Sequence, residues 1–312
     1  MDKIKAIVIV GPTASGKTSL GVKIAKHFNG EIVSADSMQI YKKMSIATAK
    51  PDAFEMQGIP HHMIDFVEPT EMYSVAKYKE DAYKCIYDIS SRGKIPVIVG
   101  GTGLYVDTLL YNTEFLDSEI DCELRKSLYE KSEKYGAQYM WDELNKIDTA
   151  SASKISPNNV KKVIRALEIY YLTGKTLSEQ NAESRLSGEI LDCVIIGLTA
   201  ESREFLYDRI NMRVDRMLSE GLLDEAKDFF GFYNKGTAVQ AIGYKELYPY
   251  IIGEKSLFEC VEKLKMQTRR YAKRQLTWFR KNKNINWLHI DGCDEDTLVK
   301  EAIRIIEERG IK

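Results

Sequence analysis

The chain lacks the features that mark membrane-spanning, disulfide-bonded and zinc-binding proteins. No apolar run in its 312 residues approaches the roughly 18 residues that a membrane-spanning helix needs. Its five cysteines are scattered and form no C-x-x-C pair. This pattern is typical of a reducing cytoplasm and argues against a disulfide framework or a zinc site. The first apolar run starts so close to the N-terminus that we expect no signal peptide.

Histidine is scarce as well. Of the four histidines, only His61 and His62 are adjacent. They follow Pro60 in an expected loop, where we expect a structural, hydrogen-bonding role rather than metal binding.

A strong net charge is also missing. The net charge is −1, and a composition of 44% hydrophobic and 29% charged residues is ordinary for a globular protein. Residues 261–283 are the exception, because they hold nine lysines and arginines and a single acid, Glu262. In a helix over residues 261–281, Leu264, Tyr271 and Trp278 recur every seven residues and predict a packing face. The other faces are almost purely basic, which predicts contact with a nucleic-acid backbone.

One segment near the N-terminus has the spacing of a phosphate-binding loop. Residues 11–18 match G-x-x-x-x-G-K-[ST], with a strand-like run at 4–10 before them and a helical stretch at 18–28 after them. Such a loop directs backbone N–H groups at phosphate oxygens; its lysine reaches the outer phosphate and its threonine hydroxyl ligates Mg²⁺. We expect a diphosphate or triphosphate to bind at Gly11, Pro12, Thr13, Ala14, Ser15, Gly16, Lys17 and Thr18.

Apolar strands alternate with helical patterns as far as residue 110. Further strands are expected at 31–35 and 95–99, and a helix at 75–90. This alternation predicts an α/β fold with a P-loop NTPase-like parallel sheet covered by helices. Ligands of such sheets bind at the carboxyl ends of the strands. The phosphate loop, Asp36 and Thr102 are therefore expected to meet at one rim.

Beyond residue 112 the pattern changes to charged amphipathic helices without a convincing strand. The last of these helices is expected to have Ser156 as its N-cap, Pro157 at its first position and Gly174 at its end. The expected helices cover residues 122–134, 137–147 and 157–173.

Strand-like runs return at residues 193–198 and 285–290. A separate C-terminal domain is therefore disfavoured. We interpret residues 113–192 as a helical insertion into an α/β core formed by residues 1–112 and 193–312.

Asp36 follows the second expected strand, and three roles are open for it. It could cap a helix, ligate Mg²⁺ or act as a general base. Many NTP hydrolases hold Mg²⁺ with a second acid at the end of another apolar strand. Here the strand at 95–99 is followed by glycines and Thr102. This weakens the case for an ATPase and leaves Asp36 as the nearest acid for proton transfer.

A basic stripe marks one predicted helix of the C-terminal half. Arg209, Arg213 and Arg216 lie at i, i+4 and i+7 and share a face. Two interpretations stay open. The stripe could be solvated and paired with Asp208 and Asp215, or it could clamp a phosphate group.

Several motifs can be taken together. They lie at residues 11–18, 34–41, 48–51, 100–105, 165–168, 243–244 and 268–275. In this order and combination they resemble the bacterial tRNA isopentenyltransferases, the tRNA dimethylallyltransferase family. The resemblance runs over nearly the whole chain, and the combination is far more specific than the phosphate loop alone.

The resemblance implies transfer of a dimethylallyl group from dimethylallyl diphosphate to N6 of the adenosine just 3′ of the tRNA anticodon. It implies Mg²⁺ as the cofactor and diphosphate as the leaving group. Asp36 would be the base, Thr102 would contact the acceptor nucleotide, and Arg213 would bind the diphosphate. Lys17 would join Arg213 there, and Thr18 would be the metal ligand. A phosphate loop without a second acid fits this reaction.

The resemblance also implies contacts with the tRNA anticodon stem-loop. The insertion would grip the stem-loop, and the target adenine would be flipped out of its stack to reach Asp36. The expected contacts are Asp36, Ser37, Met38, Gln39, Thr102, Arg125, Lys161, Lys162, Val163, Ile164, Arg165, Val239, Gln240, Ala241, Ile242, Gly243 and Tyr244. The basic helix adds Arg269, Lys273 and Arg274 to them.

Three other functions remain as alternatives: an adenylate isopentenyltransferase, a small-molecule kinase that uses ATP, and an NTP-dependent RNA-binding switch. The insertion and the basic helix argue against the first, since a free nucleotide needs neither. The switch predicts no covalent product. We expect a cytoplasmic monomer with tRNA and dimethylallyl diphosphate as partners and no membrane association.

Overall fold

The computed structural model describes residues 3–113, 122–183, 188–233 and 236–311. The chain forms two compact units. The core consists of Met1–Leu110 and Ile190–Lys312, and the insertion is Tyr111–Glu189. Among the described residues, no helix has the length and apolarity to cross a bilayer.

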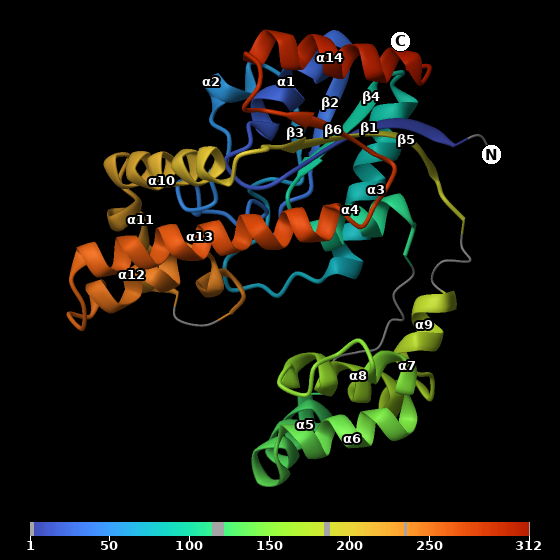
Figure 1. Cartoon of the computed structure of the whole chain (residues 1–312), viewed down its shortest axis with the longest axis vertical. Coiled ribbons are helices and arrows are strands. Elements are labelled where there is room, and N and C mark those ends of the chain that lie inside the picture. The colour runs from blue at the N-terminus through green and yellow to red at the C-terminus, as the bar shows by residue number, and fades with distance from the viewer. Residues whose placement is uncertain (1–2, 114–121, 184–187, 234–235, 312) are drawn as a thin grey trace. The chain divides into compact units, whose positions relative to one another are not determined.

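A six-stranded sheet of parallel strands forms the centre of the core (Figure 1). The strands are β1 (Ile4–Val10), β2 (Gly30–Ser34), β3 (His61–His62), β4 (Ile95–Gly100), β5 (Leu191–Thr199) and β6 (Ile285–His289). Their order across the sheet is β3, β2, β4, β1, β5, β6. Val8 of β1 pairs with Ile98 of β4 on one side and with Ile195 of β5 on the other. The predicted α/β fold with a P-loop-like parallel sheet is confirmed.

Helices cover both faces of this sheet, so its strands are apolar on both sides. Helices α1 (Lys17–His27) and α14 (Glu295–Glu308) pack on one face, where Leu20 and Ile306 meet Ile7. Helices α3 (Val75–Ser91) and α4 (Gly103–Leu110) pack on the other. Because successive side chains of a strand point to opposite faces, β1 supplies alternate residues to the two clusters. A short helix, α2 (Ala53–Met56), lies between β2 and β3.

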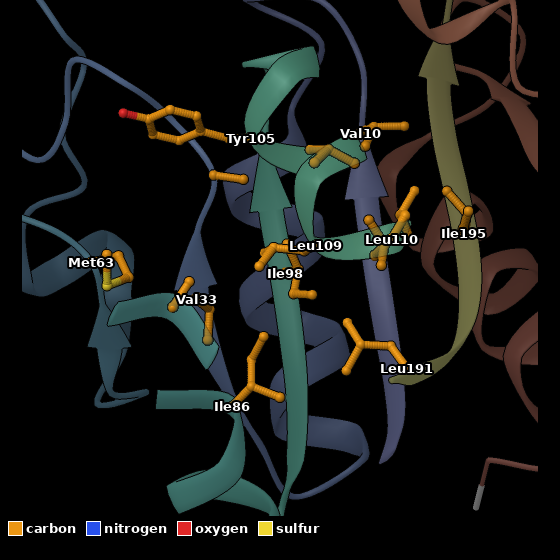
Figure 2. Close-up of a cluster of buried hydrophobic side chains, with 14 of the residues drawn as sticks. Val10, Val33, Met63, Ile86, Ile98, Tyr105, Leu109, Leu110, Leu191 and Ile195 are labelled. Atoms are coloured by element: carbon orange, nitrogen blue, oxygen red, sulfur yellow. The ribbon is translucent and has the colours of Figure 1, made fainter. Parts of the chain in front are cut away.

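Figure 2 shows the cluster on the second face. Val10, Val33 and Ile98 extend from three neighbouring strands, and Ile86 of α3 and Leu109 of α4 pack against them. This packing fixes the carboxyl ends of β1, β2 and β4 relative to one another. The loops that follow those strands therefore start from fixed positions.

Four helices near the C-terminal end of the chain make a third apolar cluster. They are α10 (Arg203–Ser219), α11 (Leu222–Phe232), α12 (Tyr244–Ile251) and α13 (Leu257–Phe279), with a 3-10 turn, η1 (Ala238–Gln240), before α12. Their buried side chains, among them Val214, Leu222 and Leu264, pack with Ile40 and Met44, which follow β2. The cluster therefore holds the segment after β2 against the C-terminal helices.

The insertion has its own small core. It contains α5 (Cys122–Tyr135), α6 (Ala137–Ile147), α7 (Thr149–Ala152), α8 (Val160–Thr173) and α9 (Leu177–Glu183). Leu128, Met140 and Leu167 are buried together in it. No strand forms among the described residues of this unit, as the sequence predicts. Gly174 ends α8 with a left-handed φ of 70°, also as predicted.

Three predicted boundaries were wrong. Helix α8 begins at Val160, because Ser156 and Pro157 form a turn closed by the Asn159 N–H and the Ser156 carbonyl at 2.8 Å. Strand β5 already begins at Leu191, inside the range expected for the insertion. Helix α13 begins four residues early, at Leu257, where Ser256 and Glu259 form a capping box.

His61 and His62 form the short edge strand β3 instead of the expected loop. His62 Nε2 lies 2.8 Å from the buried carboxylate of Glu31, which also accepts hydrogen bonds from Arg92 and Lys94. These cations, Arg92 foremost, hold the pKa of Glu31 well below its usual range. His61 Nδ1 in turn lies 2.8 Å from the Ile59 carbonyl oxygen, so the predicted hydrogen-bonding role is confirmed for both histidines.

Candidate functional site

A cavity of about 330 Å³ lies in the core beside the carboxyl ends of β1, β2 and β4. The phosphate loop contributes Thr13, Lys17 and Thr18 to its wall. The segment after β2 contributes Asp36, Ser37, Met38, Gln39, Ala47, Thr48 and Ala49. The C-terminal helices contribute Arg213, Val214, Met217, Leu222, Gln240, Ala241, Ile242, Gly243, Lys245, Leu264, Thr268, Tyr271, Arg274 and Gln275. The predicted meeting of the phosphate loop with the segment after β2 is therefore present.

The phosphate loop is closely packed between β1 and α1. Gly11 has no room for a side chain, because a Cβ atom there would lie 2.7 Å from the Leu198 carbonyl oxygen. Ala14 and Gly16 have left-handed φ values of 62° and 92°. Such a succession of turns is how a loop brings backbone N–H groups into one anion-binding concavity. The loop thus has the backbone of a phosphate cradle.

The cation of this loop is Lys17. Its Nζ atom donates to the Pro12 carbonyl oxygen at 2.6 Å. Burial, reinforced by the positive charge of Arg213, lowers the pKa of Lys17 to about 7, although the negative charge of Asp36 opposes the shift. An anion bound between Lys17 and Arg213 would relieve this repulsion.

The three arginines of the α10 stripe have different surroundings. Arg209 Nε donates to the Ala14 carbonyl oxygen at 2.8 Å and so supports the phosphate loop. Arg213 lines the cavity, and its pKa is lowered by burial and by Arg216, with Asp36 opposing. Arg216 is exposed and pairs with Glu220. The interpretation of the stripe as uniformly solvated is therefore wrong for Arg209 and Arg213, and phosphate binding by Arg213 stays a prediction.

Asp36 occupies the start of the segment after β2. Its Oδ1 atom accepts hydrogen bonds from the backbone N–H groups of Met38 at 2.9 Å and Gln39 at 3.4 Å. Within the described part of the chain, no donor reaches Oδ2. Asp36 thus caps its own turn with Oδ1, and its Oδ2 is left to accept a hydrogen bond from a donor in the cavity. The capping and proton-transfer roles that the sequence left open are compatible.

Thr102 connects the segments after β2 and β4. Its Oγ1 atom accepts from the Ser37 N–H at 3.0 Å, and its own N–H donates to the Ala35 carbonyl at 3.1 Å. Gly100 allows this approach, since a Cβ atom there would lie 2.2 Å from the Ala35 oxygen. Thr102 therefore holds the turn that carries Asp36.

Four cavity-lining residues of α13 were not predicted as site residues: Leu264, Thr268, Tyr271 and Gln275. Gln275 is buried; its Oε1 accepts from the Thr13 N–H at 2.8 Å and its Nε2 donates to the Gly101 carbonyl at 2.9 Å. Tyr271 lines the cavity instead of the packing face assigned to it. Burial and the charge of Asp36 raise the pKa of Tyr271, against hydrogen bonds with Thr102 and Gln275. The periodicity of α13 offered one signal for Gln275, which is a polar residue among the otherwise apolar buried positions of the helix.

The seven-residue repeat also misassigned Trp278. The buried positions of α13 are Cys260, Leu264, Ala272, Gln275 and Phe279, whereas Trp278 is partly exposed. Its indole Nε1 donates to Asp107 at 2.8 Å and its ring covers Gly103. The heptad spacing therefore identified one buried residue of the three.

The basic residues of α13 differ in what they contact. Arg269 Nη1 donates to Asn211 at 2.7 Å, and its guanidinium lies over the Tyr207 ring. Arg274 stacks on Tyr271 at the cavity. Lys273 is exposed. Of these predicted RNA contacts, Arg269 is half-buried, whereas Lys273 and Arg274 are exposed.

Several predicted tRNA contacts have buried side chains. Ala241 and Tyr244 belong to the apolar cluster of the C-terminal helices, and Val239 packs against it. The side chain of Tyr244 is fully buried, whereas Ala241, although buried, also lines the cavity, and contact of either residue with RNA stays a prediction. Gln240, Ile242 and Gly243 line the cavity, as do Ser37, Met38 and Gln39.

In the insertion, the predicted contacts on α8 divide by helical face. Val163 and Ile164 fill the core of the insertion with their side chains, so only their backbone is left for the predicted contact with RNA. Lys161 and Lys162 are exposed on the other side of the helix.

Two predicted arginines of the insertion share one acid. Arg165 is exposed, and it donates to Glu168, which lies buried on α8. Arg125 of α5 donates to the same carboxylate through Nε and Nη2 at 2.9 and 2.8 Å. This pairing holds α5 to α8.

Comparisons with known proteins agree on one family. The IPP transferase model matches residues 39–282, and the isopentenyl transferase model matches residues 4–71. The tRNA dimethylallyltransferase of Acetivibrio thermocellus is 52% identical over 306 residues, which is 97% of each chain. That of Halalkalibacterium halodurans is 48% identical over 308 residues, again 97% of each chain.

Solved structures give the same result. The full-length tRNA isopentenylpyrophosphate transferase from Bacillus halodurans aligns with a TM-score of 0.73 and 45% identity over 98% of both chains. A eukaryotic dimethylallyltransferase acting on tRNA aligns with a TM-score of 0.82 and 34% identity, over 99% of this chain and 81% of that one.

Fold and cavity together define an α/β protein of the P-loop class with two partly buried cations and a carboxylate in one cavity. The extent of the matches then decides the family. The chain belongs to the IPP transferase family, and the predicted resemblance is confirmed.

Proposed function

We propose that this protein is a tRNA dimethylallyltransferase. It transfers a dimethylallyl group from dimethylallyl diphosphate to N6 of the adenosine next to the anticodon on its 3′ side. The observation that carries the proposal is the cavity, because the cations Lys17 and Arg213 and the carboxylate Asp36 all line it. A diphosphate donor and an amine acceptor each find a suitable group in the same small space.

The donor's diphosphate binds at the phosphate loop. Backbone N–H groups of the loop and the N-terminus of α1 favour its negative charge. Lys17 and Arg213 approach from two elements, and their mutual repulsion falls when an anion lies between them. The apolar side chains of Val214, Met217 and Leu222 line the same cavity and suit the five-carbon chain.

Mg²⁺ fits the residues present. Thr18 and Asp36 both line the cavity and offer hard oxygen ligands, and Mg²⁺ commonly takes one or two such protein ligands beside substrate phosphates. When bound, the ion would neutralise charge that develops on the leaving diphosphate. We propose Thr18 as its principal protein ligand.

The acceptor reacts through its exocyclic amine. The N6 nitrogen forms a bond to C1 of the dimethylallyl group, the C1–O bond breaks, and the diphosphate leaves with the electron pair. Asp36 takes the proton that N6 loses. Its free Oδ2 is the acceptor of that proton, while Oδ1 stays bound to the turn. Thr102 keeps the turn in place.

The rest of the molecule binds the RNA. A cavity of about 330 Å³ accepts one flipped base rather than a stacked anticodon loop. Lys273 at the exposed face of α13, with Lys161 and Lys162 of the insertion, supplies positive charge for the phosphate backbone. The insertion acts as the grip on the anticodon stem-loop. We further propose that the protein works in the cytoplasm as a monomer.

One incubation tests this function. Undermodified tRNA, dimethylallyl diphosphate and Mg²⁺ are combined with the protein, and the nucleosides are analysed by mass spectrometry. We expect an adenosine carrying one dimethylallyl group beside the anticodon. Free AMP as the preferred acceptor would indicate an adenylate isopentenyltransferase, and transfer of label from [γ-³²P]ATP would indicate a kinase.

A further inference from the structure

A single carboxylate organises the loop that follows the first turn after β2. Glu225 of α11 accepts hydrogen bonds from three consecutive backbone N–H groups. Ser45 and Ile46 donate to Oε2 at 2.9 and 2.8 Å, and Ala47 donates to Oε1 at 2.9 Å. Consecutive N–H groups that converge in this way form an anion-binding nest. Here the anion is a side chain 178–180 residues further along the chain.

The carboxylate is itself held by a buried tyrosine. Tyr244, at the start of α12, donates its hydroxyl to Glu225 Oε1 at 2.9 Å, and its side chain is fully buried. Each carboxylate oxygen then accepts two hydrogen bonds, which uses the lone pairs of both. This saturation fixes the position of Glu225 and, through it, the three N–H groups.

The other end of the loop, at Thr48 and Ala49, is held by Gln39, which lies three residues after Asp36. Gln39 Nε2 donates to the Thr48 carbonyl at 3.3 Å and to the Ala49 carbonyl at 3.1 Å, and its Oε1 accepts from Ser34 Oγ at 3.1 Å. The backbone of residues 45–49 is thus tied at both ends by side chains of the protein. Its methyl-bearing residues, Ala47, Thr48 and Ala49, line the cavity.

Two separate sets of contacts meet at the cavity. Among the hydrogen bonds of the described residues, those of Glu225 go to Tyr244 and the loop at 45–49 and none goes to the phosphate loop or to Arg213. The loop at 45–49 is connected to Asp36 instead, because Gln39, which holds it, also donates its backbone N–H to Asp36 Oδ1. A loop already tied on both ends can shape the place of the acceptor base before RNA arrives.

We propose that Glu225 is a positioning residue for the acceptor base, acting through the wall formed by residues 45–49. The proposal rests on the function proposed above. The carboxylate contacts neither substrate. It holds the wall against which the flipped base is placed beside Asp36.

Glu225→Gln tests the proposal. The amide keeps the shape of the side chain, but an NH₂ group replaces one of the two carboxylate oxygens. Because NH₂ is a donor, at least one of the three backbone N–H groups loses its acceptor. We expect kcat/KM for tRNA to fall about tenfold, chiefly as a rise in KM for tRNA. The dissociation constant for inorganic pyrophosphate should stay within twofold of the wild-type value. Tyr244→Phe removes one of the four hydrogen bonds and should show a smaller change of the same kind.

Asp224→Asn is the matched control. It removes the same charge one residue earlier on α11, from an exposed side chain that pairs with Lys227. We expect wild-type kinetics from it. If Glu225→Gln instead weakens pyrophosphate binding and tRNA kinetics in equal measure, in step with a loss of folded protein, the residue is only structural and the proposal is wrong.

Amide hydrogen exchange separates this proposal from the function itself. In Glu225→Gln, exchange should accelerate in peptides that cover residues 45–47 and stay unchanged in peptides that cover the phosphate loop. Faster exchange with unchanged KM for tRNA would overturn the positioning role, and unchanged exchange would overturn the hold on the loop. A wild-type protein that never prenylates tRNA would instead refute the proposed function, whatever the exchange result.

Discussion

Lys17 donates its Nζ proton to the carbonyl oxygen of Pro12, in the same phosphate loop, at 2.6 Å. The ammonium therefore sits inside the loop that it serves, in surroundings that disfavour its charge. Its pKa of about 7 has burial as the first cause and the neighbouring Arg213 as the second. The negative charge of a bound diphosphate would oppose both effects and raise the pKa of Lys17, and this leads to the first prediction.

Binding of inorganic pyrophosphate should take up a proton at Lys17. The free group has a pKa of about 7, and the bound anion raises it, so a proton must be added on binding above that pH. From pH 7 to 9 the deprotonation of Lys17 should lower the affinity for pyrophosphate by at most about tenfold per pH unit. Lys17→Met should bind pyrophosphate more weakly and should also lack this part of the pH dependence.

Calorimetry in buffers of different ionisation enthalpy measures the proton uptake. Pyrophosphate itself titrates, but this contribution is the same for the wild type and for Lys17→Met. The difference between the two proteins in the slope of log affinity against pH therefore measures the contribution of Lys17. Lys23→Met, on the same helix, serves as the control. Equal slopes for wild type and Lys17→Met would mean that Lys17 is charged throughout.

Asp36→Asn should abolish most turnover and preserve tRNA binding. The asparagine oxygen can still accept from the Met38 N–H, so the turn survives while the base is lost. We expect kcat to fall by roughly 10²–10⁴, the usual range for loss of a general base. Single-turnover kinetics with saturating tRNA measure this. Asp208→Asn, an exposed aspartate of α10, should be normal; a variant at position 36 with half the wild-type rate would remove the residue from this role.

Replacement of residues 113–188 by a short Gly/Ser linker should leave a folded core. The Asn112 side chain reaches the Gly188 carbonyl at 3.2 Å, so the two ends of the insertion lie close enough to be joined. The shortened protein should bind pyrophosphate normally, because every residue that lines the cavity belongs to the core. Binding of an anticodon stem-loop should drop steeply. Normal modification of tRNA by the shortened protein would show that the grip lies elsewhere.

Neutralisation of Arg270 and Lys273 should weaken the salt dependence of tRNA binding. Both are exposed on α13, outside the cavity lining. Phosphate contacts release counterions at about 0.7–0.9 per contact, so the slope of log K against log[salt] should become shallower by roughly one to two units. kcat at saturating tRNA should not change.

The matched control replaces Lys300 and Arg309, two exposed cations of the C-terminal segment, by glutamine. Filter binding over a salt series compares the three proteins. A slope that stays at the wild-type value in the α13 variant, together with a lower melting temperature, would assign the two side chains to stability instead of RNA binding.

Glu31→Gln should destabilise the core in a pH-dependent way. The pKa of Glu31 lies below its ordinary value of 4.5, first because of Arg92. A carboxylate whose pKa is lowered by folding contributes stability above its unfolded pKa and loses it as the pH falls through the folded one. We expect a loss of about 1–3 kcal/mol at pH 7, since the cationic partners are half exposed. Urea unfolding at pH 7 and below pH 4 should show the difference shrinking with acid.

The sequence predicted those parts of the structure that depend on local pattern. The apolar run at residues 4–10 became β1 at the same residues, because a strand covered on both faces needs only continuous apolar character. The start of α8 was misread, because Ser156 and Pro157 suit both a helix N-terminus and a turn. The spacing of residues alone cannot decide between them.

Those parts of the site that belong to a local sequence motif could be predicted. Those parts that depend on contacts between side chains distant in the sequence could not. The phosphate loop and Asp36 follow strands and could be placed from strand order. Gln275 and Glu225 could not, because each binds backbone groups from far away in the chain. No periodicity of α11 distinguishes Glu225 from ordinary polar residues, and Gln275 differs only in being a polar residue on the apolar side of α13.

The bond between Gln275 and Thr13 joins positions 262 residues apart. A ribosome synthesises Thr13 long before Gln275, so over that stretch the nascent chain has the phosphate loop without the side chain that connects it to the segment after β4. The contact between the loop and Gln275 can therefore form only after α13 has been synthesised. A truncated product that ends before α13 should be unable to sequester the cell's prenyl diphosphate, even though it carries the whole phosphate-binding motif.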